Sequence, residues 1–296
     1  MDTVVYLIRH GTTDYNTDFK YQGSHDIPLN ELGLAQGALL TDYFKDIPID
    51  AGYTSHLIRA RQTLDFALGD RKDKIPVHVV PDIAEIDQGI TEGRTIQEMD
   101  ILFPAFSDAI NHAPGSANAP RGEKVKHAYE RMHKSILSFA QANPGKTIVV
   151  ASHGFVIQTF LNYASGIPVE DMKDWVLDNV AVSRFTYDDD WNLHIDYIGD
   201  SKHLTDDLQV NYDWGIVDRT RHLLLYDSGK GEEKADRLRQ AMEKAGRCYA
   251  QRDLAKEPLY DEEKEALLLK KNGREALEKG FPLIVTRDEV FTDFEE

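Results

Sequence analysis

The sequence contains one cysteine, Cys248, among its 296 residues. A single cysteine excludes an internal disulfide, a C-x-x-C redox motif and a zinc site built from thiolates. Long apolar runs are also absent, since no stretch approaches the length of a membrane-spanning helix and no basic segment followed by an apolar one opens the chain. We therefore expect a cytoplasmic protein that does not bind membranes.

Positive charge is scarce as well. The chain has 34 Lys and Arg against 51 Asp and Glu, which gives a formal net charge of −17. Nucleic acids and anionic membranes bind surfaces rich in lysine and arginine, so neither is expected as a partner. An anionic substrate would need a local group of cationic side chains within this negative field. The 41% hydrophobic and 29% charged residues are typical of a globular protein.

Three short apolar segments end in polar residues that suit a phosphate. These segments are typical of buried strands, and they are Val4–Ile8, Ile49–Tyr53 and Thr147–Ala151. The residues that follow them are Arg9-His10-Gly11, Thr54-Ser55 and Ser152-His153-Gly154. In open α/β sheets, ligands bind at the carboxyl edge of the strands. We therefore expect a site where these three strands end.

Helix and strand patterns alternate along residues 1–218. Helices are predicted at Glu31–Asp46, in the segment of Arg59 with Ser55 as its cap, near 125–139 and at Phe155–Ala164. Further strands are predicted at Val77–Val80, Val180–Tyr187 and Leu193–Ile198. This order predicts a three-layer α/β/α domain with a mostly parallel sheet. The segment Ile101–Arg121, which contains three prolines, is predicted to be an irregular connection that covers a site.

Residues 219–296 are predicted to form a second, smaller α/β domain. Strands are expected at His222–Tyr226, Tyr249–Leu254 and Phe281–Val285, with helices between them. The order of these elements is similar to the thioredoxin layout, in which a strand and a long helix are followed by a proline before a later strand. Ser228–Gly231 stands where the redox cysteines of that family would lie, so a thioredoxin-like module here would serve binding or dimerisation. An unrelated α/β appendage is the alternative, and the sequence leaves open whether the protein forms a homodimer.

The polar residues at the strand ends suit phosphoryl transfer to a histidine. A neutral imidazole, here His10, is a good nucleophile and divides hydrolysis into two easier steps. Arginine forks and a second histidine stabilise the negative charge of the transferred group, and the candidates are Arg9, Arg59 and His153. A carboxylic acid can protonate the leaving alkoxide and then take a proton from the attacking water.

Glu85 is the candidate acid, because its apolar neighbours favour the protonated form of a carboxyl group. Asp82, Asp87 and Glu92 lie close by in the sequence and are interpreted as surface charges or helix caps. Taken singly, His153 would be a hydrogen-bonded core histidine and Arg59 a solvated helix residue. It is their combination with the other clusters that favours an active site.

Several motifs, in one order along the first 200 residues, resemble the histidine phosphatase superfamily, the phosphoglycerate mutase-like branch. They are Leu7-Ile8-Arg9-His10-Gly11-Thr12 with Asn16, Gln22-Gly23 with Asp26-Ile27-Pro28-Leu29 and Gly33, Ser55-x-x-x-Arg59-Ala60-x-Gln62-Thr63, Glu85 with Gly89 and Glu92-Gly93, and Ser152-His153-Gly154. The resemblance implies that His10 becomes phosphorylated and that Glu85 is the proton donor. It assigns phosphoryl binding to Arg9, Arg59 and His153, and substrate binding to Asn16, Gln22, Gly23 and Gly154. It implies no metal and no cofactor.

The resemblance leaves two reactions within the family. Cofactor-dependent phosphoglycerate mutases carry an Arg and a Tyr directly behind the acid, where this sequence has Ile86-Asp87-Gln88, and Arg121 is the one arginine in 100–125. These differences favour a phosphatase that acts on a small phosphorylated metabolite, with water as the acceptor. The alternatives are mutase-type transfer, and a non-catalytic phosphate-binding or scaffold protein that acts through its C-terminal domain.

Overall fold

The computed structural model describes residues 1–208, 222–226, 236, 240, 249–253, 284–285 and 290–291. The chain forms two compact units: unit 1 is Met1–Gly93 with Asp108–Tyr212, and unit 2 is Arg94–Ser107 with Asp213–Glu296. The domain boundary predicted at residue 218 lies outside the described residues and stays a prediction.

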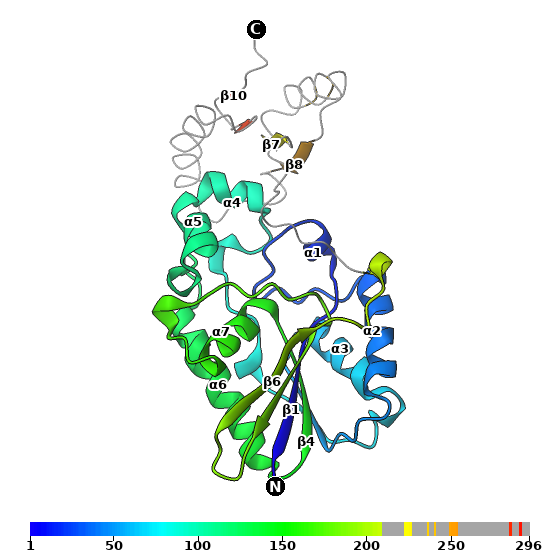
Figure 1. Cartoon of the computed structure of the whole chain (residues 1–296). Coiled ribbons are helices and arrows are strands. Elements are labelled where there is room, and N and C mark those ends of the chain that lie inside the picture. Colours follow the sequence, from blue (N-terminus) through cyan, green and yellow to red (C-terminus); the bar gives the residue numbers. More distant parts are fainter. Residues whose placement is uncertain are drawn as a thin grey trace. The chain divides into compact units, whose positions relative to one another are not determined.

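Unit 1 is built on a sheet that includes β1, β4 and β6 (Figure 1). The six strands of this sheet follow the order β3-β2-β4-β1-β5-β6. The strands are β1 Thr3–Arg9, β2 Ala51–Thr54, β3 Val77–Val79, β4 Thr147–Ser152, β5 Val182–Tyr187 and β6 Leu193–Asp200. The strands β3, β2, β4 and β1 run parallel, whereas β5 is antiparallel to β1 and β6 to β5. The predicted mostly parallel sheet is confirmed, with an antiparallel hairpin at one edge.

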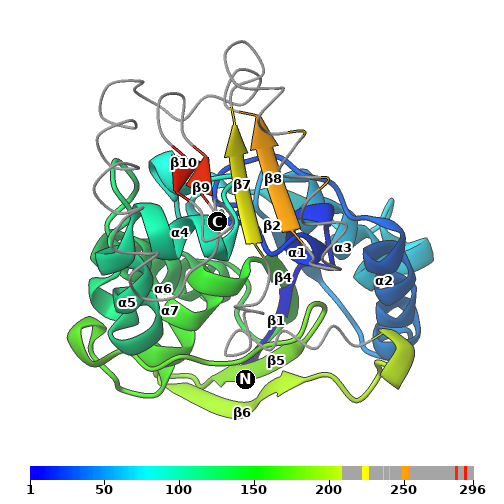
Figure 2. The same cartoon turned by 90° about the horizontal axis from the view of Figure 1, so that it is seen from above.

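Helices cover both faces of this sheet (Figure 2). They are α6 (Val125–Ala142) and α7 (Gly154–Ala164) on one face, and α2 (Glu31–Phe44) and α3 (Ile58–Leu68) on the other. Because side chains alternate along a strand, Val5 and Leu7 of β1 pack with the α6–α7 layer, and Tyr6 and Ile8 with the α2–α3 layer. The three-layer α/β/α prediction is confirmed, and β1 lies in the core of unit 1.

The segment Ile101–Arg121 is largely helical, so its prediction as an irregular connection is wrong. It contains the end of α4 (Ile96–Leu102), all of α5 (Pro104–His112) and a 3-10 turn at Pro114–Ser116. Two of its prolines begin these elements, at a position where a missing N–H costs no hydrogen bond. Its role as a cover of the site stays a prediction. The other short helices are α1 (Asp14–Thr17), η1 (Gly69–Arg71), η2 (Pro81–Ile83), η3 (Gly89–Thr91), η5 (Val169–Asp171) and η6 (Asp206–Leu208).

The described part of unit 2 contains α4, the first residues of α5 and two strand pairs. β7 (His222–Tyr226) runs parallel to β8 (Tyr249–Asp253), and β9 (Ile284–Val285) pairs antiparallel with β10 (Val290–Phe291). The strand predicted at 222–226 is confirmed, and so are residues 249–253 of the strand predicted at 249–254. Ser228–Gly231 and Pro282 lie outside the described residues, so the thioredoxin-like layout stays a prediction.

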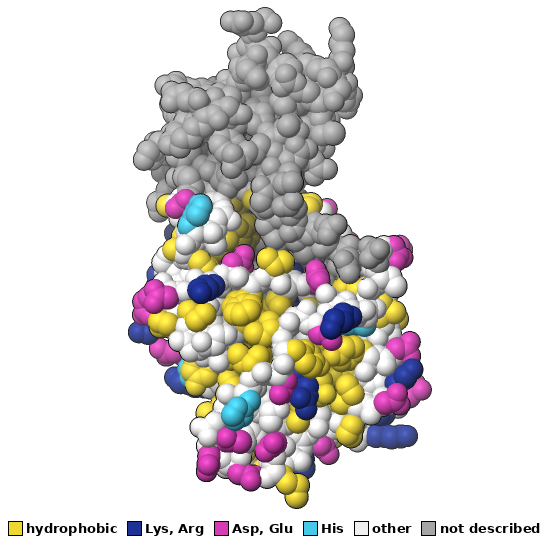
Figure 3. Space-filling view, in the orientation of Figure 1, with side chains coloured by type: hydrophobic (Ala, Val, Ile, Leu, Met, Phe, Trp, Pro, Cys, Tyr) yellow, Lys and Arg dark blue, Asp and Glu magenta, His cyan; other side chains and the backbone are white. Residues whose placement is uncertain are grey.

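Charges are dispersed on the face of the molecule that Figure 3 shows. Cationic side chains there stand among acidic and apolar ones rather than together in a patch. Within the described part of the chain, no helix is both long and apolar enough to cross a membrane.

Candidate active site

The register of two neighbouring strands brings the two predicted histidines together. β1 and β4 are adjacent and parallel, with Arg9 opposite Ser152. The next residues on these strands are His10 and His153, whose ring centroids lie 5.2 Å apart. On the other side of β4, β2 leads directly into Ser55. The three predicted strand ends therefore lie side by side at the carboxyl edge of the sheet.

The ring of His10 is buried and oriented by its own backbone. Its Nδ1 lies 2.7 Å from the carbonyl oxygen of Gly11. A carbonyl only accepts, so Nδ1 carries the proton and Nε2 keeps its lone pair. Burial lowers the pKa of His10 well below its ordinary value, and the charges of Arg59 and Arg9 lower it further. The site therefore holds a neutral imidazole with Nε2 as its nucleophilic atom.

His153 is held by Ser55, whose hydroxyl lies 2.6 Å from Nε2 of the ring. Ser55 Oγ also accepts an N–H from Leu57 at 3.2 Å, and which of Ser55 and His153 donates in their bond depends on the tautomer of the imidazole. Nδ1 of His153 is buried with no partner among the described residues. Burial, followed by the charge of Arg59, lowers the pKa of His153 well below its ordinary value. The prediction that Ser55 caps α3 is wrong, since that helix has Leu57 at its N-cap.

These lowered pKa values predict acid-sensitive folding. Below the ordinary imidazole pKa of 6.5, the unfolded chain takes up protons at His10 and His153 that the folded chain does not. Each such histidine makes the free energy of unfolding fall by about 1.4 kcal/mol per pH unit as the pH drops from 6.5 towards the folded-state pKa. Urea unfolding of the wild type and His153→Gln between pH 7.5 and 5.5 measures this. We expect a shallower pH slope in the variant, and equal slopes would contradict the buried neutral state.

Arg59 lies on α3 with its side chain fully buried. Its Nη1 donates to the carbonyl of His25 at 2.6 Å and its Nη2 to the carbonyl of Gly23 at 2.9 Å. Its Nε is buried without a partner among the described residues. Burial lowers the pKa of Arg59 to about 10, opposed by nearby carboxylates of which Glu85 acts most strongly. The guanidinium is therefore charged at neutral pH and positioned beside both histidines.

Arg9 ends β1, and its Nη1 donates to the carbonyl of Leu177. A side chain at Gly154 would place Cβ 3.3 Å from Nε of Arg9, so the glycine leaves room for the guanidinium beside the first residue of α7. A helix N-terminus also favours a negative charge. Arg9 and the start of α7 thus bring positive charge to the edge of the sheet at which the histidines lie.

The carboxylate of Glu85 lies at the N-terminus of α7. It accepts N–H hydrogen bonds from Ile86 at 3.0 Å and from Phe155 and Val156 at 3.1 Å each. Phe155 is two residues beyond His153, so the carboxylate and the imidazole share this end of the helix. Backbone donors of this kind suit an ionised carboxylate.

Asn16 and Gln22 are grouped around Thr13, which lies at the N-cap of α1. Asn16 Oδ1 accepts from the Thr13 backbone N–H and hydroxyl, each at 3.1 Å. The same hydroxyl lies 3.0 Å from Gln22 Oε1. The structure thus joins two predicted pocket residues close in sequence to His10, and their contact with a substrate stays a prediction.

Comparison with known families agrees with this geometry. A match to the histidine phosphatase superfamily (branch 1) covers residues 5–196 and so includes every site residue above. The chain belongs to this superfamily.

Relatives of the chain bear the names of both phosphatases and mutases. It is 30% identical over 192 residues to the uncharacterized phosphatase PhoE of Bacillus subtilis, covering 64% of this chain and 92% of that one. It is 29% identical over 184 residues to the probable phosphoglycerate mutase GpmB of Cronobacter sakazakii, covering 62% and 84%. Among solved structures, a phosphoserine phosphatase mutant from Entamoeba histolytica in complex with phosphoserine matches with a TM-score of 0.60 and 27% identity, covering 69% and 100%.

Glu92 has a role that the sequence interpretation missed. Its side chain is 7% exposed, so its interpretation as a surface charge or helix cap is wrong. It accepts from the Ser24 N–H at 2.7 Å, the Ser24 hydroxyl at 2.9 Å and the Gln88 N–H at 3.0 Å. It therefore anchors the loop whose Gly23 and His25 carbonyls hold Arg59.

The glycine at position 23 is required by the backbone φ angle and by the space around it. Its φ is +50°, and a Cβ there would lie 2.0 Å from Glu92 Oε1. We expect Gly23→Ala to lower the free energy of unfolding by roughly 2–4 kcal/mol, from backbone strain and displacement of Glu92. Gly166→Ala is the matched control, because Gly166 has a φ of +70° with nothing within 4 Å of its Cβ. Urea unfolding of both variants separates the cost of backbone strain from the cost of the overlap with Glu92. Equal losses in the free energy of unfolding would mean that the Glu92 contact is unimportant.

The backbone of residues 9–12 is held by polar side chains that the sequence interpretation left without a role. The Gly11 N–H donates to Thr63 Oγ1 at 3.0 Å, and the Thr12 N–H to Gln36 Oε1 at 2.9 Å. Asn179 Nδ2 donates to the His10 carbonyl at 2.7 Å. Thr63 had a signal in the sequence, since it lies one helical turn after Arg59.

Val180 adds a strained backbone to the same support. Its N–H donates to the carbonyl of Arg9 at 3.1 Å. Its φ is +57°, in the left-handed region that a β-branched residue rarely adopts. Such strain persists where surrounding structure fixes it, often beside an active site.

Proposed function

We propose that this chain is a metal-independent phosphatase that hydrolyses small phosphomonoesters through a phosphohistidine on His10. The carrying observation is the pair of buried imidazoles 5.2 Å apart, with the Nδ1 proton of His10 bound to a carbonyl. This arrangement leaves His10 Nε2 as a nucleophile and gives a transferred phosphoryl group a second histidine beside it.

In the first step, His10 Nε2 attacks phosphorus and the bond between phosphorus and the ester oxygen breaks. Arg9, Arg59 and His153 would hold the phosphoryl oxygens and stabilise their negative charge. Glu85, in its protonated form, would give its proton to the leaving oxygen. The products of this step are an alcohol and phosphohistidine.

In the second step, water attacks the phosphohistidine. The ionised Glu85 would take a proton from that water, and the bond between phosphorus and His10 Nε2 breaks. Phosphate leaves and the neutral imidazole is restored. The three N–H donors fix the position of the Glu85 carboxyl group at the N-terminus of α7.

Water is the proposed acceptor because the mutase signals are missing. Ile86-Asp87-Gln88 follows the acid in place of the mutase Arg and Tyr. The phosphoserine complex of the Entamoeba histolytica relative supports a small phosphorylated substrate. Mutase-type transfer is the second candidate, because the Cronobacter sakazakii relative is named a probable phosphoglycerate mutase.

Product analysis tests the proposal. The protein is incubated in chelator with alkyl phosphates, sugar phosphates, phosphoserine and 3-phosphoglycerate, the last with and without 2,3-bisphosphoglycerate. We expect phosphate release from several esters. Conversion of 3-phosphoglycerate to 2-phosphoglycerate with little free phosphate would favour the mutase, and neither reaction with no phosphoenzyme would favour a binding protein.

A further inference from the structure

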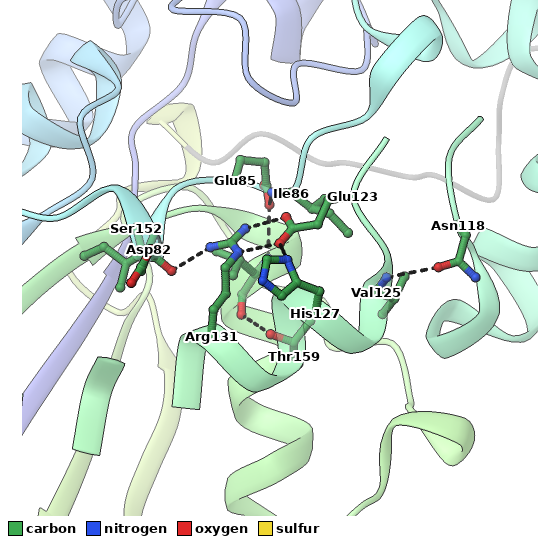
Figure 4. A network of polar contacts seen from close by, with 12 residues as sticks. Asp82, Glu85, Ile86, Asn118, Glu123, Val125, His127, Arg131, Ser152 and Thr159 are labelled. Carbon is green, nitrogen blue, oxygen red and sulfur yellow. Dashed lines mark hydrogen bonds and ion pairs between the residues drawn. The ribbon is translucent and has the colours of Figure 1, made fainter. Parts of the chain in front are cut away.

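An ion pair between Glu123 and Arg131 lies beside the loop that carries Glu85 (Figure 4). Arg131 extends from α6, and its Nε and Nη2 lie 2.7 and 2.8 Å from the two carboxylate oxygens of Glu123. The side chains are 12% and 13% exposed. A bidentate pair of this kind fixes both the distance and the plane of its partners.

The same two residues hold both ends of the Glu85 loop. The third guanidinium nitrogen of Arg131, Nη1, donates to the carbonyl of Asp82 at 2.6 Å. The backbone N–H of Glu123 donates to the carbonyl of Asp87 at 2.8 Å. Glu85 stands between these two anchor points, so the ion pair joins the start of its loop to the end.

Apolar packing fixes the loop to the same helix. Ile83, fully buried, belongs to the apolar cluster of Met132 on α6. Ile86, 2% exposed, belongs to the cluster of Val125 at the start of that helix. These two side chains flank Glu85 in the sequence, so the carboxyl group lies between two anchored residues.

The backbones on the Glu123 side pack too closely for side chains. A Cβ on Gly122 would lie 2.3 Å from the Asp87 carbonyl oxygen, and one on Gly89 would lie 2.4 Å from the Pro120 carbonyl oxygen. The loop therefore has little room to shift while the ion pair is formed. Burial raises the pKa of the Glu123 carboxyl, but the hydrogen bonds and charge of Arg131 outweigh it and hold this pKa below its ordinary value. The pair is thus ionised at neutral pH.

We infer that Arg131 and Glu123 are positioning residues that set where the carboxyl group of Glu85 meets the ester oxygen. The inference rests on the phosphatase function proposed above and adds a supporting pair to it. A general acid must lie within about 2.6–3.2 Å of the atom that it protonates. A displacement of about 1 Å can lower a rate about a hundredfold, so loss of the pair should impair proton delivery specifically.

Two substrates separate proton delivery from every other function of the site. An alkyl phosphate such as phosphoserine needs a proton on its leaving oxygen, whereas p-nitrophenyl phosphate releases a stable phenolate without one. We expect Arg131→Met to lower kcat/KM for the alkyl ester by at least about tenfold and for the aryl ester by less than about twofold. Glu123→Gln should also lower the ratio of kcat/KM for the alkyl ester to kcat/KM for the aryl ester. This variant replaces Arg131→Met in the test if Arg131→Met does not fold.

Two controls complete the experiment. Arg184→Met breaks a partly buried ion pair to Asp196, 2.8 Å long, that joins β5 to β6 rather than contacting the loop that carries Glu85, and it should leave the ratio of the two kcat/KM values unchanged. Glu85→Gln should lower kcat/KM for the alkyl ester at least as much as Arg131→Met does, with little change for the aryl ester. If Arg131→Met lowers kcat/KM for both esters equally, the inference is overturned. Such a result would point instead to the charge of Arg131 acting on His153.

The outcome for Glu85→Gln separates this inference from the proposed function. If Glu85→Gln lowers kcat/KM for both esters equally, Glu85 is not the acid and the inference is wrong. Phosphatase activity of the wild type on the aryl ester would still support the proposed function. If the wild type hydrolyses neither ester and forms no phosphohistidine, the proposed function itself is wrong.

Discussion

Replacing His10 by alanine should lower kcat/KM for any phosphomonoester by at least about 10⁴-fold. The change removes Nε2, the one atom of the residue whose lone pair is left available by the Nδ1 hydrogen bond to Gly11. It leaves Arg59 and His153 in the site, so a phosphate product should still bind. The measurements are steady-state hydrolysis and calorimetric titration with inorganic phosphate.

The matched variant is His78→Ala, because His78 lies on the edge strand β3 and is exposed. It should hydrolyse esters at the wild-type rate. A His10→Ala protein that folds and retains more than about one hundredth of the activity would require another nucleophile, and the phosphohistidine mechanism would be abandoned.

Arg59→Met should have the second largest effect. The loss of the guanidinium removes positive charge beside both histidines, and we expect kcat/KM to fall by about 10²–10³-fold. It also leaves the carbonyls of Gly23 and His25 without their donor, at a cost of about 1–3 kcal/mol each in the free energy of unfolding. Because the charge of Arg59 contributes to the lowered pKa values of His10 and His153, both pKa values should rise. Hydrolysis rates, urea unfolding and NMR titration of the imidazoles measure the three effects.

Arg61→Met is the control on the same helix, since Arg61 is exposed and should contribute to neither activity nor stability. Arg59→Lys keeps a charge but cannot bridge two carbonyls as a planar fork does, so an intermediate loss is expected. An Arg59→Met enzyme with normal kinetics would show that the guanidinium supports only the loop.

The sequence was sufficient to predict the sheet and the meeting of the histidines, because both depend on local signals. A β-branched run that leads into Arg-His or Ser-His marks a strand and its carboxyl end together. Once β1 and β4 are neighbours in register, His10 and His153 have to be adjacent. The motifs around Arg59 and Glu85 also lie within single loops or helices.

The supporting contacts could not be predicted because they join residues far apart in the chain. Asn179 reaches the carbonyl of His10 across 169 positions, and Ser55 reaches His153 across 98. Glu92 was interpreted as a surface charge or helix cap because charged residues lie near it in the sequence. Its burial results from the packing of two loops that are distant in the sequence. The segment 101–121 was misjudged because its prolines were taken as breaks, although two of them begin helical turns.

The most direct test of the account is to find where the phosphoryl group goes. The protein is mixed with a phosphomonoester, quenched in alkaline denaturant within a turnover, and digested for mass spectrometry of its peptides. We predict phosphate on the peptide that contains His10, stable in alkali and lost in acid, as a phosphoramidate is. Rapid ester hydrolysis without any phosphorylated peptide, or with phosphate on another residue, would contradict the account.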